Sequence, residues 1–301
     1  MASGDWISTA GSSSPLGPLG PHGPRSPLDP HAAATIPVDP VDLRADQPQP
    51  ARMYDYFLGG RTNFTADRQA AELVLNSYPE ARRFARENRG FLRRAIAHLT
   101  GAGIRQFLDI GTGIPTSPNT HELAQAVHRD AHVVYADRDP LVLAHARELM
   151  SSTPEGRVDY LQGDLREPAS LLAHPALSGP QAALDLEQPV ALLLVAVLHF
   201  LEDRDEPWAL VQELMKPLAS GSFLVISHMA LDIDPEGMAR AGEVYKASRI
   251  PGQARDRAQV ARFADGWELL EPGVTTIDRW GLARPPQIAP VSCHAFVARK
   301  P

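Results

Sequence analysis

Residues 106–115 read Gln-Phe-Leu-Asp-Ile-Gly-Thr-Gly-Ile-Pro, and the remainder of the chain is organised around them. Residues 107–110 form a short apolar run, which predicts a buried strand with Asp109 near its end. Gly111 and Gly113 follow, and glycine lets a flat ligand approach the backbone without meeting a Cβ. A strand, a glycine turn and a helix in this order predict the first unit of a nucleotide-binding α/β domain.

The loop departs from the fingerprint of dinucleotide-binding proteins. That fingerprint is Gly-x-Gly-x-x-Gly, and here Thr116 replaces the third glycine. Pro115 and Pro118 lack the N–H groups that would bind a diphosphate. A ligand that contains adenosine but no phosphate, such as S-adenosylmethionine, fits this loop better. Ser117 is expected to cap the following helix, with Pro118 at its first position.

Two further apolar runs carry an acid at the spacing of a strand–helix–strand unit. Asp137 ends residues 133–137, 28 residues after Asp109, and Asp164 follows 27 residues later. The carboxyl ends of parallel strands meet at one edge of a sheet, so these acids are expected to lie together. We expect Asp137 to accept the ribose hydroxyls, Asp164 to accept from the adenine amino group, and Leu165 to cover the ring.

Other residues complete the candidate cofactor-binding set. Thr112 lies between the two glycines, and Arg138 follows Asp137 directly. Asp139 precedes Pro140 and is interpreted as the cap of the next helix. Three acids at three consecutive strand ends indicate a ligand site more specifically than any one of them.

Composition narrows the class of protein. The chain has 301 residues, a net charge of −7 and a pI near 5.9, which argues against a dedicated nucleic-acid binder. Its single cysteine, Cys293, excludes a disulfide framework and a multi-cysteine metal site, and no metal is expected. No apolar run is long enough to span a bilayer and no signal-peptide pattern opens the chain, which predicts a soluble, cytoplasmic protein.

The chain divides by composition into three parts. Residues 1–50 hold 10 of the 28 prolines and few large apolar residues, so they are predicted to be disordered. Residues 51–100 are expected to form an N-terminal helical extension, and residues 101–301 the cofactor-binding domain.

Residues 51–63 combine three aromatic side chains with a Gly-Gly pair. Gly59 and Gly60 must turn the chain, and Asn63 or Thr65 can cap the helix that follows. This block is either a helix–turn–helix corner or a lid over the cofactor or acceptor. The lid reading makes Gly59 a candidate cofactor contact and Tyr54 a candidate catalytic residue.

The segment from about residue 80 to 99 has helical periodicity. Asn88 falls on its apolar stripe and needs a partner there, either an internal hydrogen bond or a ligand, and we count it as a candidate cofactor contact. A row of arginines on the same segment is interpreted as a solvated face. It comprises Arg82, Arg83, Arg86, Arg89, Arg93 and Arg94.

The C-terminal half predicts four more strands. Residues 189–198 are apolar throughout, as in a central parallel strand, and residues 222–227 form the next. Residues 267–277 and 291–299 are expected to close a seven-stranded, mostly parallel sheet as an antiparallel edge. The fold class is therefore a Rossmann-like α/β fold with helices on both faces.

His199 follows the fourth strand, at the edge where such sheets bind ligands. Its ordinary pKa suits a general base, although a histidine packed under the next helix is the alternative. His228, after the fifth strand, is a second candidate, and Tyr54, Asp55 and Tyr56 could complete the site.

Four segments resemble the actinobacterial S-adenosyl methyltransferase family. They are residues 54–64, 87–92, 106–116 and 133–140. The resemblance implies a class I methyltransferase fold that binds S-adenosylmethionine and methylates an unidentified acceptor, with a small molecule expected. Two alternatives stay open: a non-catalytic S-adenosylmethionine sensor or partner protein, and a nicotinamide-dependent oxidoreductase, which Thr116 and the two prolines disfavour.

Overall fold

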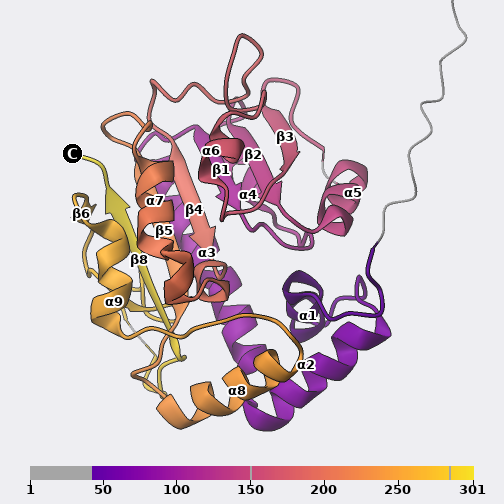
Figure 1. Ribbon diagram of the computed structural model, residues 1–301. Helices are drawn as coiled ribbons and strands as arrows, with labels where there is room; N and C mark the ends of the chain where they lie inside the picture. Colours follow the sequence, from indigo (N-terminus) through magenta and orange to yellow (C-terminus); the bar gives the residue numbers. More distant parts are fainter. Residues whose placement is uncertain (1–42, 150, 285) are drawn as a thin grey trace, which may run out of the picture. The chain divides into compact units, whose positions relative to one another are not determined.

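The strands are ordered so that the glycine loop follows a strand in the middle of the sheet. The computed structural model describes residues 43–149, 151–284 and 286–301. The strand order is β3-β2-β1-β4-β5-β8-β6, with β7 paired to β8 (Figure 1). The strands are β1 (Gln106–Ile110), β2 (His132–Asp137), β3 (Arg157–Gln162), β4 (Ala191–Val195), β5 (Phe223–Met229), β6 (Glu268–Leu269), β7 (Thr275–Thr276) and β8 (Cys293–Arg299).

The predicted fold class is confirmed, with one strand divided. Strands β1 to β5 are parallel, and β8 lies antiparallel to β5. The predicted strand at residues 267–277 is present only as its two ends, β6 and β7. Pro272 lies between them and has no N–H for a ladder, and Gly273 has a φ of 74°. The expected seven strands are therefore eight among the described residues.

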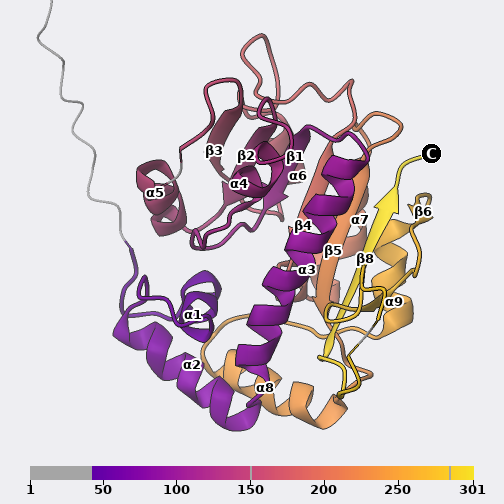
Figure 2. The same cartoon turned by 180° about the vertical axis from the view of Figure 1, so that it is seen from behind.

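Helices cover both faces of the sheet because successive strand side chains point to opposite sides. Leu108 and Ile110 join the core under α6, α7 and α9, whereas Phe107 joins the core under α3 and α4. Figure 2 shows α3 crossing its face of the sheet. The helices are α1 (Pro50–Phe57), α2 (Thr65–Ser77), α3 (Ala81–Gly101), α4 (Thr120–Gln125), α5 (Pro140–Leu149), α6 (Pro168–Leu172), α7 (Pro207–Met215), α8 (Pro235–Ala247) and α9 (Arg257–Ala261).

Helices α1, α2 and α8 form a separate layer beyond the carboxyl ends of the parallel strands (Figure 1). They share an apolar core that includes Met53 from α1, Val74 from α2 and Met238 from α8. The first residues of α3 complete it with Ala81 and Ala85. The N-terminal extension therefore packs against a helix from the C-terminal half.

Residues 43–50 are ordered, although they fall within the segment predicted to be disordered. Leu43 packs beside Ile114 and Leu141, and the Gln49 backbone N–H donates to Asp67 Oδ1 at 2.8 Å. The predicted disorder therefore does not apply to residues 43–50, and its remainder, residues 1–42, lies outside the described residues.

Two predicted helix caps are corrected. Helix α4 begins at Thr120, after Asn119, and the Ser117 hydroxyl instead donates to Glu122 Oε1 at 3.0 Å. Helix α2 begins at Thr65, and Asp67 of its first turn accepts from the Phe64 N–H at 2.7 Å. In both helices a carboxylate lies three residues after the residue that precedes the helix, Glu122 after Asn119 and Asp67 after Phe64. It accepts from the backbone N–H of that preceding residue, as in a capping box.

The arginine row on α3 is largely engaged in contacts and is not a plain solvated face. Arg94 donates to the carbonyls of Ile277 and Trp280, and Arg83 contacts the buried Asp278. Arg86 and Arg93 are exposed, as expected. Among the described residues, no helix has both the length and the apolar composition needed to cross a bilayer.

Candidate functional site

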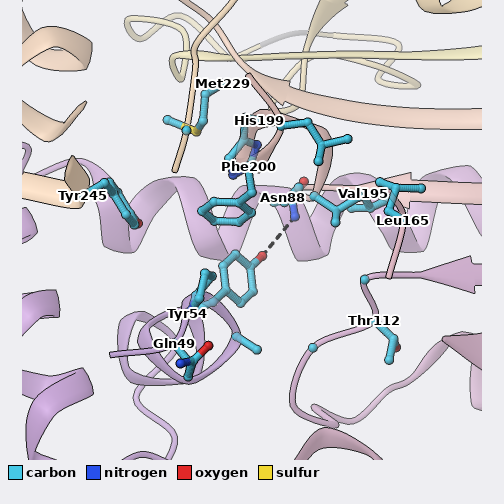
Figure 3. Close-up of a pocket in the computed structure, with 18 of the residues that line it drawn as sticks. Gln49, Tyr54, Asn88, Thr112, Leu165, Val195, His199, Phe200, Met229 and Tyr245 are labelled. Carbon is cyan, nitrogen blue, oxygen red and sulfur yellow. Dashed lines mark hydrogen bonds between the residues drawn. The ribbon is translucent and has the colours of Figure 1, made fainter. Parts of the chain in front are cut away.

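One cavity lies at the carboxyl ends of the parallel strands and extends under α1, α2 and α8. Figure 3 shows Thr112 and Leu165 on one side of it and Tyr245 on the opposite side, with Tyr54, Phe200 and His199 between them. We call the part formed by the strand ends and their loops the strand-end half. The part formed by α1, α2, α8 and the start of α3 is the helical half.

The glycine loop borders the strand-end half, but its two glycines are required for different reasons. Gly111 has a φ of 74°, and a Cβ there would lie 2.4 Å from Cγ2 of Val197. Gly113 has a φ of 69°, and a Cβ there would meet nothing within 4 Å. The open space predicted beside both glycines exists at Gly113, whereas Gly111 is dictated by packing against the loop after β4.

Asp109 is buried at the end of β1. Its Oδ2 accepts from the Thr120 hydroxyl at 2.7 Å. Burial raises the pKa of Asp109 to about 6, against the opposing effects of the Thr120 hydrogen bond and the Arg89 charge. Arg89 itself borders the cavity and donates to the carbonyls of Thr116 and Pro118, each at 2.6 Å. The loop after β1 is therefore tied to α3.

Asp137 connects the ends of β1 and β2. Its Oδ2 accepts from the Gly113 N–H and its Oδ1 from the Asp139 N–H, each at 2.9 Å. Burial raises the pKa of Asp137, and these two backbone donors oppose the rise. Each oxygen retains a lone pair for a further donor. The carboxylate thus borders the cavity and can accept from a diol, which is what the ribose assignment requires.

Asp164 and Leu165 follow β3 and also border the strand-end half. Asp164 is partly exposed and accepts from the Arg166 N–H at 2.9 Å, and its Oδ2 lies 3.9 Å from Arg138. Leu165 is buried. The arrangement brings an acceptor and an apolar surface side by side, as a purine site needs, and leaves Arg138 at its rim.

A buried ion pair joins α1 to the strand ends. Arg52 donates through Nε and Nη2 to both carboxylate oxygens of Asp139, each at 2.9 Å. The side chains are 1% and 7% exposed. Asp139 Oδ1 also accepts from the Leu141 N–H, so its predicted role as a cap is confirmed. The ion pair was not predicted, because in the sequence Arg52 is only one polar residue within the aromatic block 51–63.

Tyr54 and Asn88 are hydrogen-bonded to each other within the cavity wall (Figure 3). The Tyr54 hydroxyl donates to the Ala85 carbonyl at 3.0 Å and accepts from Asn88 Nδ2 at 3.0 Å. Asn88 Oδ1 accepts from the Ser227 hydroxyl at 2.6 Å. Burial raises the pKa of Tyr54 to about 12. Asn88 therefore has the internal hydrogen-bond partners that were one of its two predicted alternatives. The Tyr54 hydroxyl uses its donor and one acceptor position within the protein.

Gly59 does not border the cavity, unlike the other predicted cofactor residues. It has a φ of 83° and follows the C-terminal cap of α1, so its glycine is explained by the turn. A Cβ at Gly60 would lie 2.0 Å from Asp55 Oδ1, and Asp55 Oδ2 accepts from Asn63. Asp55 is therefore part of the corner, and Tyr56 contacts Glu72 outside the cavity.

His199 lies where the two halves meet. It is 9% exposed, borders the cavity, and has a buried Nδ1 with no hydrogen-bond partner among the described residues. Burial, followed by the positive charge of Arg255, lowers the pKa of His199 to about 3. The imidazole is therefore neutral near pH 7 and can accept a hydrogen bond, although it is a weak base.

Behind His199 lies a polar cluster that sequence reasoning missed. Arg255 is fully buried and donates to His228 Nε2 at 2.9 Å and to Asp203 Oδ1 at 2.8 Å. His228 Nδ1 donates to the Met229 carbonyl, so His228 is neutral, and it does not border the cavity. The cluster holds the loop after β4 against β5, and His228 is not placed to act on a ligand.

The arrangement supplies acceptors, an apolar cavity and a neutral imidazole. Among the described residues, no group of three or more His, Cys, Asp or Glu side chains is suited to a metal ion. Transfer of an activated methyl group needs mainly that the reacting atoms be held in line, and such a site suits that task.

Comparison with known proteins agrees with this geometry. The model of a family described as S-adenosyl methyltransferase matches residues 38–301. A search of curated proteins returned no match.

Solved structures give close matches. A DUF574 family protein from Streptomyces avermitilis is 40% identical, with a TM-score of 0.80 over 86% of this chain and 100% of that one. A putative methyltransferase from Thermobifida fusca is 35% identical, with a TM-score of 0.79 over 89% and 99%. Magnesium protoporphyrin IX methyltransferase from Synechocystis is similar in fold alone, at 14% identity and a TM-score of 0.50 over 83% and 93%. The chain therefore belongs to the S-adenosyl methyltransferase family and uses S-adenosylmethionine as its methyl donor.

Proposed function

We propose that S-adenosylmethionine occupies the strand-end half and that a small-molecule acceptor enters the helical half. One observation carries this proposal: a single cavity runs from the glycine loop to α8. A methyl donor and an acceptor must meet within it, because methyl transfer requires the two reacting atoms in line and in contact. When bound, the cofactor supplies an activated methyl group.

The strand-end residues suit the adenosine part of the cofactor. Asp137 has carboxylate lone pairs left for the ribose hydroxyls, and the backbone at Gly113 leaves space beside it. Asp164 can accept from the adenine amino group while Leu165 packs on the ring. Asp109, Gly111, Thr112 and Arg138 also border this half, and Asn88 borders the cavity from α3. Gly59 is left out of the proposed site.

His199 and Tyr54 are proposed to act on the acceptor in different ways. His199 would accept a hydrogen bond from the acceptor, since its ring is neutral and its Nε2, unlike the buried Nδ1, is not sealed in the wall and has no partner among the described residues. Its low pKa favours orientation of the acceptor over storage of a proton. Tyr54 would hold the wall in place, because its hydroxyl already bonds Ala85 and Asn88.

The test is transfer of a labelled methyl group from S-adenosylmethionine to a library of neutral and charged small molecules. We expect label in low-mass products that pass an ultrafiltration membrane, and none with Asp137→Ala. Asp130→Ala, which removes an exposed acid far from the cavity lining, is the matched control and should keep full activity.

Label that remains on added protein or nucleic acid would contradict a small-molecule acceptor. Binding of S-adenosylmethionine without transfer to any class of acceptor would favour the alternative of a sensor protein. A cytoplasmic location stays a prediction.

A further inference from the structure

The two halves of the cavity differ in charge. The charged residues that border it belong to the strand-end half or to the adjoining face of α3. They are Arg89, Asp109, Asp137, Arg138, Asp139, Asp164 and Arg166. Among the described residues, no acidic or basic side chain borders the helical half, apart from the neutral His199. An ion moved into this half would lose its hydration without gaining a charged partner, so an uncharged ligand is favoured there.

Aromatic rings line the helical half and its junction with the loop after β4. The Tyr54 and Phe84 rings meet edge to face, with centroids 6.0 Å apart. The His199 and Phe200 centroids are 4.4 Å apart, and those of Phe200 and Tyr245 are 6.1 Å apart. Figure 3 shows Tyr54, Phe200 and Tyr245 around the same space. Such walls favour a flat aromatic molecule over a saturated one, because rings stack or meet edge to face with defined geometry.

A polar group faces this apolar space where it meets the strand-end half. His199 borders the cavity and is nine-tenths buried; its Nδ1 is sealed within the wall, whereas Nε2 is not sealed and has no hydrogen-bond partner among the described residues. The neighbouring Tyr54 hydroxyl and Asn88 carboxamide oxygen are already bonded within the wall. A neutral imidazole can accept one hydrogen bond, and a donor on a ligand in the cavity could reach Nε2.

We propose that the helical half binds a neutral aromatic acceptor that carries a hydroxyl group directed at His199. The proposal rests on the function proposed above, since it identifies the class of acceptor for the same site. In the reaction, the acceptor oxygen forms a bond to the methyl carbon. The carbon–sulfur bond breaks with its electron pair left on sulfur, and the hydroxyl proton passes to water.

The test uses the full chain saturated with S-adenosylhomocysteine and three probes in calorimetric titrations near neutral pH. The probes are 2-naphthol, the anionic analogue 2-naphthoate, in which a carboxylate replaces the hydroxyl, and the saturated alcohol 2-decalol. We expect 2-naphthol to bind about tenfold or more tightly than 2-naphthoate, because of the cost of burying a charge. We expect it to bind roughly threefold or more tightly than 2-decalol, because of the aromatic walls.

Two variants and one control test whether the probe lies between α8 and the loop after β4. Tyr245→Glu should weaken 2-naphthol binding about tenfold or more by placing a charge in the apolar wall. Ala247→Glu adds the same charge on the exposed side of α8 and should leave binding unchanged. Phe200→Leu, a milder change, should weaken 2-naphthol and leave 2-decalol unaffected, which provides a test even if Tyr245→Glu fails to fold.

Three results would overturn the proposal. They are equal affinity for 2-naphthoate, equal affinity for 2-decalol, or no binding of 2-naphthol to protein that binds S-adenosylhomocysteine. A protein that binds neither S-adenosylhomocysteine nor the probes would instead contradict the proposed function itself.

Discussion

The two halves of the cavity are built in different ways. The strand-end half is formed by the ends of the parallel strands and the short loops that follow them. Asp109, Asp137 and Asp164 border it because each lies at or just after the end of a strand in the repeated strand–loop–helix unit. The helical half joins α1 and α2 to α8, whose sequences are more than a hundred residues apart. The first half can be recognised from local patterns, whereas the second depends on long-range packing.

The largest effect on stability is expected from removing Arg52, which joins α1 to the strand ends. Arg52→Met would leave the buried Asp139 carboxylate without its ion-pair partner, and should lower the free energy of unfolding by about 3–5 kcal/mol. Urea unfolding measures this loss. Arg105→Met, which breaks the exposed pair with Asp130, should leave the free energy of unfolding nearly unchanged.

A double variant sharpens this prediction. Arg52→Met combined with Asp139→Asn removes both charges, so it should recover part of the stability lost in Arg52→Met. If Arg52→Met were no more costly than Arg105→Met, the ion pair would not join the halves in the way described.

The two glycines of the loop should respond differently to alanine. Gly111→Ala combines a positive φ with a clash against Val197 and should destabilise the fold by about 2–4 kcal/mol. Gly113→Ala meets only the backbone strain, about 1–2 kcal/mol, but adds a methyl group in open space. Thermal or urea unfolding should therefore rank Gly111→Ala as the less stable.

Rescue distinguishes packing from backbone strain at Gly111. Val197→Ala should restore part of the stability of Gly111→Ala, because it removes the atoms that the new Cβ would meet. Strictly additive effects would contradict the packing explanation.

The pH dependence of stability should have opposite signs for Asp109 and His199. A folded pKa of about 6 keeps Asp109 protonated above the unfolded value of about 3.9, so its contribution to stability falls as pH rises from about 4 through 6. A folded pKa of about 3 keeps His199 neutral, so its contribution falls as pH drops below the unfolded value of about 6.5.

Variants separate these two contributions between about pH 7.5 and pH 5. His199→Gln should abolish about 2 kcal/mol of acid destabilisation, and Asp109→Asn should abolish about 1 kcal/mol of acid stabilisation. The free energy of unfolding in urea at both pH values measures each. Parallel pH profiles for a variant and the wild type would refute the burial of that group.

A similarly small effect on stability is expected at Tyr54. Tyr54→Phe removes the hydroxyl that bonds Ala85 and Asn88, and should cost about 1–2 kcal/mol of stability. Affinity for S-adenosylhomocysteine should stay within about twofold, since these bonds lie within the wall. A loss of affinity with unchanged stability, measured by calorimetry and urea unfolding, would instead assign Tyr54 to the cofactor.

Local patterns predicted much of the fold and of the strand-end half. The apolar run before Gly111, the acid at Asp137 and the periodic stripe of α3 each depend on neighbours in sequence, and each occurs as expected. Asp139 caps α5 for the same reason. These features are determined within a few residues, so a pattern of residue types is enough to find them.

Several features that depend on distant partners were not predicted. The contact of Arg52 with Asp139 joins residues 87 apart, and the packing of Gly111 against Val197 joins two strand ends. Arg89 was assigned to a solvated face because its partner carbonyls carry no residue-specific signal. A pattern records which residues are polar, but not which distant group each of them meets.

The most direct test of the account is calorimetric titration of S-adenosylhomocysteine into wild type, Asp137→Ala and Tyr245→Glu. We expect Asp137→Ala to lose about a hundredfold in affinity, because charge-assisted hydrogen bonds to the ribose are removed. Tyr245→Glu should stay within about twofold of wild type, because its side chain lies in the other half. Unchanged binding by Asp137→Ala, or a large loss in Tyr245→Glu with its fold intact, would contradict the assignment of the cofactor to the strand ends.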